Sequence, residues 1–161
     1  MKDPAPAEGY IEVDVQAAMS AVDVPGDDVV KRWVAAAVRA AGVAGDCEVS
    51  VRFVDQQEGS ALNEQYRDRQ GPTNVLSFPA AEMLAPDAPR LLGDIVLCVP
   101  VILQEAEQGG IAPADHFAHL LVHGTLHLLG HDHAEAAEAA AMEALETRIL
   151  GEGGIADPYA A

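Results

Sequence analysis

Apolar residues occupy every second position from 11 to 15 and again from 49 to 53, with mostly polar residues between them. This period of two predicts two half-buried β-strands. Residues 74–78 also have strand-like composition and are followed by Pro79, and residues 80–92 form a loop rich in Pro and Ala. Residues 94–99 are almost continuously apolar, which is typical of a strand buried on both faces.

Other stretches follow a helical period of about 3.6 residues. An apolar stripe lies between the first two strands; it consists of Val30, Trp33, Val34, Ala37, Val38 and Ala41. Asp27 and Asp28 suit the start of this helix and Gly42 its end. A second helix is expected from Asp55, where residues 55–58 resemble a capping box, to about 66 or 67. The C-terminal half predicts helices over 100–108, 113–129 and 134–150, with Pro113 in a first turn and Gly130 at an end.

This order of elements predicts an α/β (α+β) fold with a small mixed sheet of about four strands and helices packed on it. The 161 residues fit one domain, 1–161, and neither a repeat nor a second domain boundary is visible. Residues 1–9 and 151–161 are expected to be loose termini.

The composition restricts the possible partners and locations. Nine Lys and Arg against 26 Asp and Glu give a formal net charge of −17, which repels nucleic acid at long range, so RNA binding needs a local basic patch or a docking partner. No DNA substrate is expected. The apolar run 95–103 contains Pro100 and is shorter than the ~18 residues of a membrane span, and no signal peptide is evident, so a cytoplasmic location follows. Cys47 and Cys98 are too few for a disulfide framework, and we expect Cys98 in the core.

Residues 123–133, His-Gly-Thr-Leu-His-Leu-Leu-Gly-His-Asp-His, have the ligand spacing of a one-metal site. Residues four apart share one face of a helix, so His123 and His127 can point an imidazole at the same ion. Gly130 can take the positive φ that turns the chain back and brings His133 round as a third ligand. Three imidazoles leave one tetrahedral position open, which is typical of catalytic rather than structural zinc. Nickel, copper and iron also accept imidazole ligands.

Gly124 stands where zinc peptidases of the His-Glu-x-x-His type carry their general base. Because glycine inside a helix costs about 1 kcal/mol relative to alanine, we expect another part of the molecule to approach the backbone closely there. Ordinary zinc proteolysis is therefore disfavoured.

The other polar residues of this region allow several interpretations. A ligand set of His119, His123 and His127 is a poorer geometric alternative, because it spans about 12 Å of one straight helix. His119 is better placed in the second shell or on the helix surface, and His131 can add a ligand or contact substrate. Asp132 is expected to cap the last helix or, alternatively, to orient a ligand imidazole.

Four ordered motifs make a family resemblance specific. Residues 123–133 are preceded by 62–67 (Leu-Asn-Glu-Gln-Tyr-Arg), 72–79 (Pro-Thr-Asn-Val-Leu-Ser-Phe-Pro) and 93–95 (Gly-Asp-Ile). Together they resemble the bacterial YbeY family of rRNA maturation endoribonucleases. The resemblance implies one zinc ion on His123, His127 and His133, and a single-strand-specific endoribonuclease that matures the 3′ end of small-subunit rRNA and acts in ribosome quality control. It also implies that Arg67 lies in the active-site cleft. The chain departs from many members in having His131 where they carry an aromatic residue.

The chemistry of the residues is consistent with that implication. Zinc lowers the pKa of bound water toward ~7, so a nucleophile is available without a carboxylate at position 124. An arginine fork matches the oxygens of a phosphodiester, and Arg67 is the candidate for that role; alternatively, Arg67 only complements a helix dipole. Arg67 and His123, the latter as a ligand, are the expected catalytic residues, with single-stranded rRNA and the small ribosomal subunit and its proteins as partners. Two other functions stay open: a non-enzymatic ribosome assembly factor with a structural metal, and a metallohydrolase of small molecules or peptides.

Overall fold

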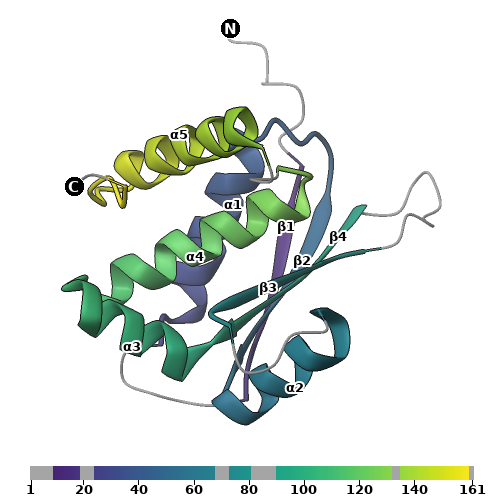
Figure 1. The fold of residues 1–161 in the computed structure, drawn as a ribbon. Helices are drawn as coiled ribbons and strands as arrows, with labels where there is room; N and C mark the ends of the chain where they lie inside the picture. Colours follow the sequence, from purple (N-terminus) through teal and green to yellow (C-terminus); the bar gives the residue numbers. More distant parts are fainter. Residues whose placement is uncertain (1–8, 19–23, 68–72, 81–89, 132–134, 160–161) are drawn as a thin grey trace, which may run out of the picture.

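The computed structural model of the chain describes residues 9–18, 24–67, 73–80, 90–131 and 135–159. Figure 1 shows a twisted sheet with α1, α4 and α5 on one side and α2 on the other. The elements are β1 (Ile11–Ala17), α1 (Asp27–Ala40), β2 (Cys47–Val54), α2 (Gln56–Arg67), β3 (Val75–Pro79), β4 (Arg90–Cys98), α3 (Val99–Gly109), α4 (Pro113–Leu128) and α5 (Ala136–Glu152). The predicted α/β class with a mixed sheet of about four strands is confirmed.

The sheet has the strand order β1-β2-β4-β3. β1 pairs in parallel with β2, and β2 pairs in parallel with β4, whereas β3 runs antiparallel to β4. β4 starts at Arg90, four residues before the predicted start at 94, because Arg90 continues the pairing with Cys47 of β2. Local apolar periodicity in the sequence does not show how far a strand continues to pair with its neighbour.

The two faces of the sheet bury cores of different size. Ile95 and Leu97 of β4 belong to the main core against α1, α4 and α5, whereas Val96 and Cys98 belong to a smaller cluster that includes Leu62 of α2. β4 is therefore buried on both faces, as its continuous apolar run predicted. Cys98 is 2% exposed, which confirms its expected place in the core.

The ends of the helices agree with most of the capping expectations. The backbone N–H of Glu58 donates to Asp55 Oδ1 (2.8 Å) at the start of α2, and Pro113 lies in the first turn of α4. Gly42 follows α1 with a φ of 78°. The expected cap of the last helix is wrong, since α5 begins at Ala136 and its N-cap residue is Glu135. Asp132, which was expected to fill that position, lies outside the described residues.

The C-terminal segment is held against the helices. Gly151 and Glu152 belong to α5, and the N–H of Ile155 donates to the carbonyl oxygen of Leu150 (2.9 Å). The Tyr159 hydroxyl donates to the buried Glu146 carboxylate at 2.7 Å. A loose terminus from 151 onward is therefore wrong for the part of this segment that the structure describes. None of the helices in the described ranges is both long enough and apolar enough to span a membrane.

Candidate metal centre on helix α4

Four of the six histidines form a row along α4: His116, His119, His123 and His127. Their ring centroids are separated successively by 6.4, 6.4 and 6.5 Å, as steps of three and four residues on a helix require. Each is partly exposed, so the row lies at the boundary between the core and solvent. The row thus places several imidazoles where an ion and a substrate could reach them.

His123 and His127 differ from the rest of the row in their orientation. Their rings are stacked with an interplanar angle of 8°, whereas the rings of His119 and His123 meet edge to face at 81°. Residues four apart lie on one face of a helix, so the two imidazoles are next to each other on the same side of α4. His119 Nε2 lies instead 2.7 Å from Glu146 Oε1. The geometry therefore favours the pair His123 and His127 over the alternative set that includes His119.

Glu146 of α5 connects the histidine row to the C-terminal segment. Its side chain is 1% exposed, and its Oε1 accepts hydrogen bonds from His119 and Tyr159. Its Oε2 lies 3.1 Å from His123 Nδ1. Because an ionised carboxylate can only accept, the proton of this bond belongs to Nδ1, and Nε2 is the nitrogen with which His123 would ligate a metal. A histidine oriented by a carboxylate is the usual partner of a protein-bound metal, so these residues fit a zinc ion.

The same contacts set the protonation of Glu146. Burial alone would raise its pKa, but hydrogen bonds from His119, His123 and Tyr159 together lower the pKa to about 2. Burial, followed by the bond to Glu146, raises the pKa of the Tyr159 hydroxyl above its ordinary value. Glu146 is thus a carboxylate and Tyr159 a neutral donor near pH 7.

This lowered pKa makes the stability of the metal-free protein depend on acid pH. The ordinary pKa of Glu146 is 4.5 and the folded value is about 2, so the unfolded chain binds more protons between those values. The free energy of unfolding should therefore fall as pH drops from about 4.5 to 2, by up to about 3 kcal/mol from this group. Urea unfolding at pH 5 and pH 2.5 measures the loss. Glu146→Gln should show a smaller loss than Glu138→Gln, an exposed control on α5, and an equal loss in both variants would contradict the assignment.

Gly124 lies where α4 packs directly on the sheet. A Cβ added there would lie 2.9 Å from Ile95 Cγ2 and 3.3 Å from both Ser77 Oγ and Val75 Cγ2. The Ser77 hydroxyl donates to the Gly124 carbonyl oxygen at 3.1 Å. The expected close approach at this glycine is confirmed, and it comes from β3 and β4. A glutamate at this position would force the side chain of Ile95 to shift.

A turn ends α4 at Gly130, three residues before the third predicted ligand in the sequence. Gly130 has a φ of 95°, its N–H donates to His127 O, and the N–H of His131 donates to Leu126 O, which together form a Schellman motif. The predicted end of the helix and the positive φ at Gly130 are confirmed. His131 is half-buried after this turn, and His133 lies outside the described residues. Within the described ranges, no three His, Cys, Asp or Glu side chains are grouped as a metal would require.

Comparison with known proteins identifies the family of the chain. The family model described as Endoribonuclease YbeY matches residues 14–154. The chain belongs to the YbeY family. A relative from Alkalilimnicola ehrlichii named Endoribonuclease YbeY is 53% identical over 137 residues, which are 84% of this chain and 82% of the relative. A relative of the same name from Xanthomonas campestris pv. campestris is 46% identical over 155 residues, 93% and 94% of the two chains.

The fold is also similar to a solved structure. The solution structure of TM1509 from Thermotoga maritima matches with a TM-score of 0.55 and 23% sequence identity, over 92% of this chain and 99% of that chain. This likeness shows that the two chains share a fold.

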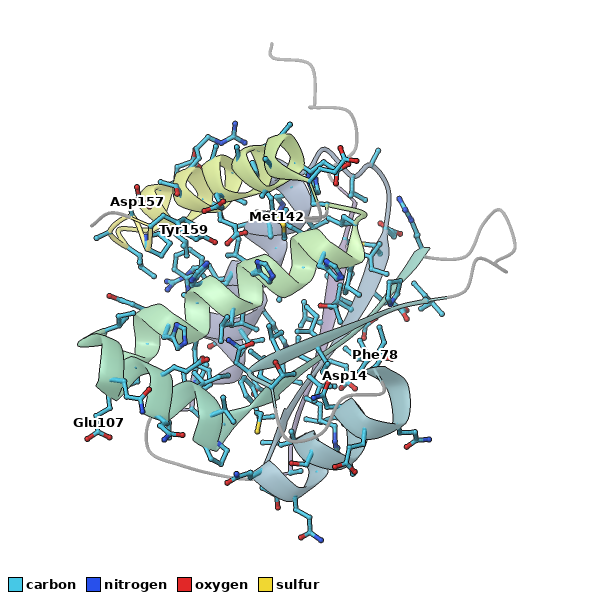
Figure 2. The ribbon with its side chains drawn as sticks, viewed as in Figure 1. Asp14, Phe78, Glu107, Met142, Asp157 and Tyr159 are labelled. Atoms are coloured by element: carbon cyan, nitrogen blue, oxygen red, sulfur yellow. The ribbon has the colours of Figure 1, made fainter. Side chains whose placement is uncertain are left out.

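The other motifs of the YbeY resemblance lie on α2, β3 and β4, and Ser77 and Ile95 of two of them contact α4 at Gly124. Arg67 is the last residue of α2, and its side chain lies outside the described part of the chain. Phe78 and Asp94 line a cavity of about 370 Å³ on the face of the sheet that also carries α2. Figure 2 shows Phe78 on that side. The same cavity is lined by Arg52, whose guanidinium forms two hydrogen bonds to Glu58, at 2.7 and 3.1 Å.

Two residues of the site were absent from the sequence-based prediction, namely Glu146 and Tyr159. Glu146 carried a local signal, because it occupies the apolar stripe of α5 with Met142, Ile149 and Leu150. A carboxylate in the buried stripe of a helix needs partners, and histidines supply them here. Tyr159 carried no such signal, since it follows the helix within a segment of Gly, Asp and Pro.

Proposed function

We propose that the chain is a zinc-dependent endoribonuclease that cuts single-stranded rRNA. Its cellular role on this proposal is maturation of the 3′ end of small-subunit rRNA and ribosome quality control, in the cytoplasm and on the small subunit and its proteins. The parallel pair His123 and His127, one turn apart on α4 with a carboxylate behind His123, carries the proposal. Membership of a family whose relatives are named endoribonucleases supplies the reaction class.

The residues have distinct parts in this proposal. His123, His127 and His133 hold one zinc ion, and His131 and Asp132 lie close enough in sequence to affect that shell or the substrate. When bound, zinc supplies Lewis-acid activation of water at neutral pH, so a carboxylate at position 124 is not needed. Glu146 keeps the Nδ1 proton of His123 in place, and the chain uses the other nitrogen as ligand.

Arg67 is assigned to the RNA rather than to the metal. A guanidinium forms paired, charge-assisted hydrogen bonds with phosphate oxygens, which gather negative charge as a phosphodiester is attacked. A cation at this position also matters because the chain has a formal net charge of −17, which disfavours RNA at long range. Arg67 therefore combines substrate binding with stabilisation of the transition state.

Arg67→Ala tests the function. We expect the variant to keep one zinc per chain and to lose cleavage of a single-stranded rRNA fragment by about 100-fold or more, the size of effect seen when a positioned charge-stabilising donor is removed. Metal content and initial cleavage rates are the measurements. Arg39→Ala, which removes an exposed side chain of equal charge from the last turn of α1, is the matched control.

Two outcomes of this experiment would contradict the proposal. Equal cleavage by Arg67→Ala and Arg39→Ala would remove Arg67 from catalysis. Zinc binding without any cleavage by the wild type, on free RNA or on small subunits, would favour the assembly factor with a structural metal. Peptide hydrolysis is disfavoured further, because a glutamate at position 124 would force the side chain of Ile95 to shift.

A further inference from the structure

Packing between the helices does not explain why the charged side chain of Glu146 is buried. It is 0% exposed and lies one turn after Met142 and one before Leu150 on the core-facing stripe of α5. An apolar side chain of similar volume at such a position is often neutral or stabilising, because it avoids the desolvation of the carboxylate. The helix interface of α4 and α5 therefore gives no reason for a glutamate here.

The contacts of Glu146 divide between its two oxygens. Oε2 contacts only one ring in the described structure, at His123 Nδ1 (3.1 Å). Oε1 receives the Tyr159 hydroxyl at 2.7 Å and His119 Nε2 at 2.7 Å. Two donors on Oε1 fix the plane of the carboxylate, and a fixed plane determines the direction from which Oε2 meets His123.

Tyr159 is itself anchored to α5. Its backbone N–H donates to Asp157 Oδ1 (2.8 Å), and the same oxygen accepts the Thr147 hydroxyl (3.1 Å). Figure 2 shows Tyr159 and Asp157 together at the C-terminal end of α5, on the side toward α4. The ring of Tyr159 also meets His119 edge to face, with centroids 5.3 Å apart. The C-terminal segment thus extends to the histidine row through a side chain with defined contacts.

We propose that Glu146 is the positioning carboxylate of the metal centre and that Tyr159, from the C-terminal segment, is the residue that holds it in place. Glu146 keeps the proton of His123 on Nδ1 and orients Nε2 for the ion, while Tyr159 and His119 keep Glu146 from rotating. Neither residue touches the metal or the RNA. The inference rests on the proposed zinc site and extends it to a residue of α5 and a residue of the segment that follows α5.

The experiment compares Glu146→Gln and Tyr159→Phe with two matched controls. Glu138→Gln makes the same change on the exposed part of α5, and Tyr10→Phe removes a hydroxyl from a residue that is 72% exposed. Zinc affinity is measured by competition with a chromophoric chelator, and circular dichroism of the metal-free proteins tests folding. The tautomer of His123 is measured from the ¹⁵N shifts of its ring nitrogens.

We expect Glu146→Gln to weaken zinc binding by about 10- to 100-fold, the range found for partners of metal-ligating histidines. Tyr159→Phe should weaken it by a smaller factor, with a folded spectrum. In both variants the metal-free His123 ring should shift from the Nδ1–H tautomer toward a mixture, and the controls should match the wild type. A purely structural role would lower stability but leave the tautomer unchanged.

The outcomes separate this inference from the proposed function. If both variants bind zinc with the affinity of the wild type and keep the wild-type tautomer of His123, the role of Glu146 and Tyr159 is overturned and the proposed function stays intact. Failure of the wild type to bind zinc would overturn both. If Glu146→Gln does not fold, Tyr159→Phe decides the question by itself, because it removes one hydroxyl and no charge.

Discussion

His127→Ala should lose zinc and RNA cleavage together. His127 supplies one of two parallel imidazoles, and its removal leaves His123 as the single ligand on α4. Losing a ligand should cost more than the about 10- to 100-fold that follows loss of an outer partner. Zinc per chain after gel filtration and the cleavage rate of a single-stranded rRNA fragment are the two measurements, and both should fall to background.

His116→Ala is the matched control for this prediction. It removes an imidazole from the same row, but His116 pairs with Glu105 (2.9 Å) and lies three helical turns from His127. We expect it to retain one zinc and wild-type cleavage. Undiminished cleavage by a zinc-free His127→Ala protein would show that the activity does not depend on this site.

Gly124→Glu should destabilise the fold instead of adding a general base. The first atom of the new side chain would already lie 2.9 Å from Ile95 Cγ2, and the carboxylate would follow into an apolar interface. An uncompensated buried charge costs about 3–5 kcal/mol, which corresponds to a drop in Tm of roughly 10 °C for a domain of this size. Urea and thermal unfolding of the metal-free proteins measure the loss.

Gly151→Glu makes the same substitution at a helical glycine with open space around it. Nothing lies within 4 Å of a Cβ at Gly151, and the residue is exposed on α5. We expect this control to unfold at nearly the wild-type temperature. A Gly124→Glu protein as stable as this control would refute the close packing of α4 on β3 and β4 as the reason for the glycine.

The local pattern of apolar residues predicted most of the fold because it follows directly from which faces of each element are buried. The alternation in β2 and the 3.6-residue stripe of α1 match the buried faces that the structure gives them. The start of β4 at Arg90 and the start of α5 at Ala136 differ from the prediction. The first depends on pairing with β2. At the start of α5, residues 132–135 have the pattern of a capping box, but the helix begins after Glu135.

The candidate site was predictable to the extent that it is local to one helix. The spacing of His123 and His127 determines that they share a face of α4, and the structure adds that their rings are parallel. Glu146 and Tyr159 come from elements that only tertiary packing brings to α4. A carboxylate in an apolar stripe can be read from sequence, but the identity of its partners depends on how α5 crosses α4.

The most direct test of the central claim is cleavage of a short, 3′-extended small-subunit rRNA fragment by wild-type protein before and after chelation and after zinc is added back. His127→Ala protein purified in parallel measures contaminating nuclease. The account predicts cleavage that chelation abolishes and zinc restores, in the wild type alone. Cleavage that persists equally in the chelated wild type and in His127→Ala would contradict it.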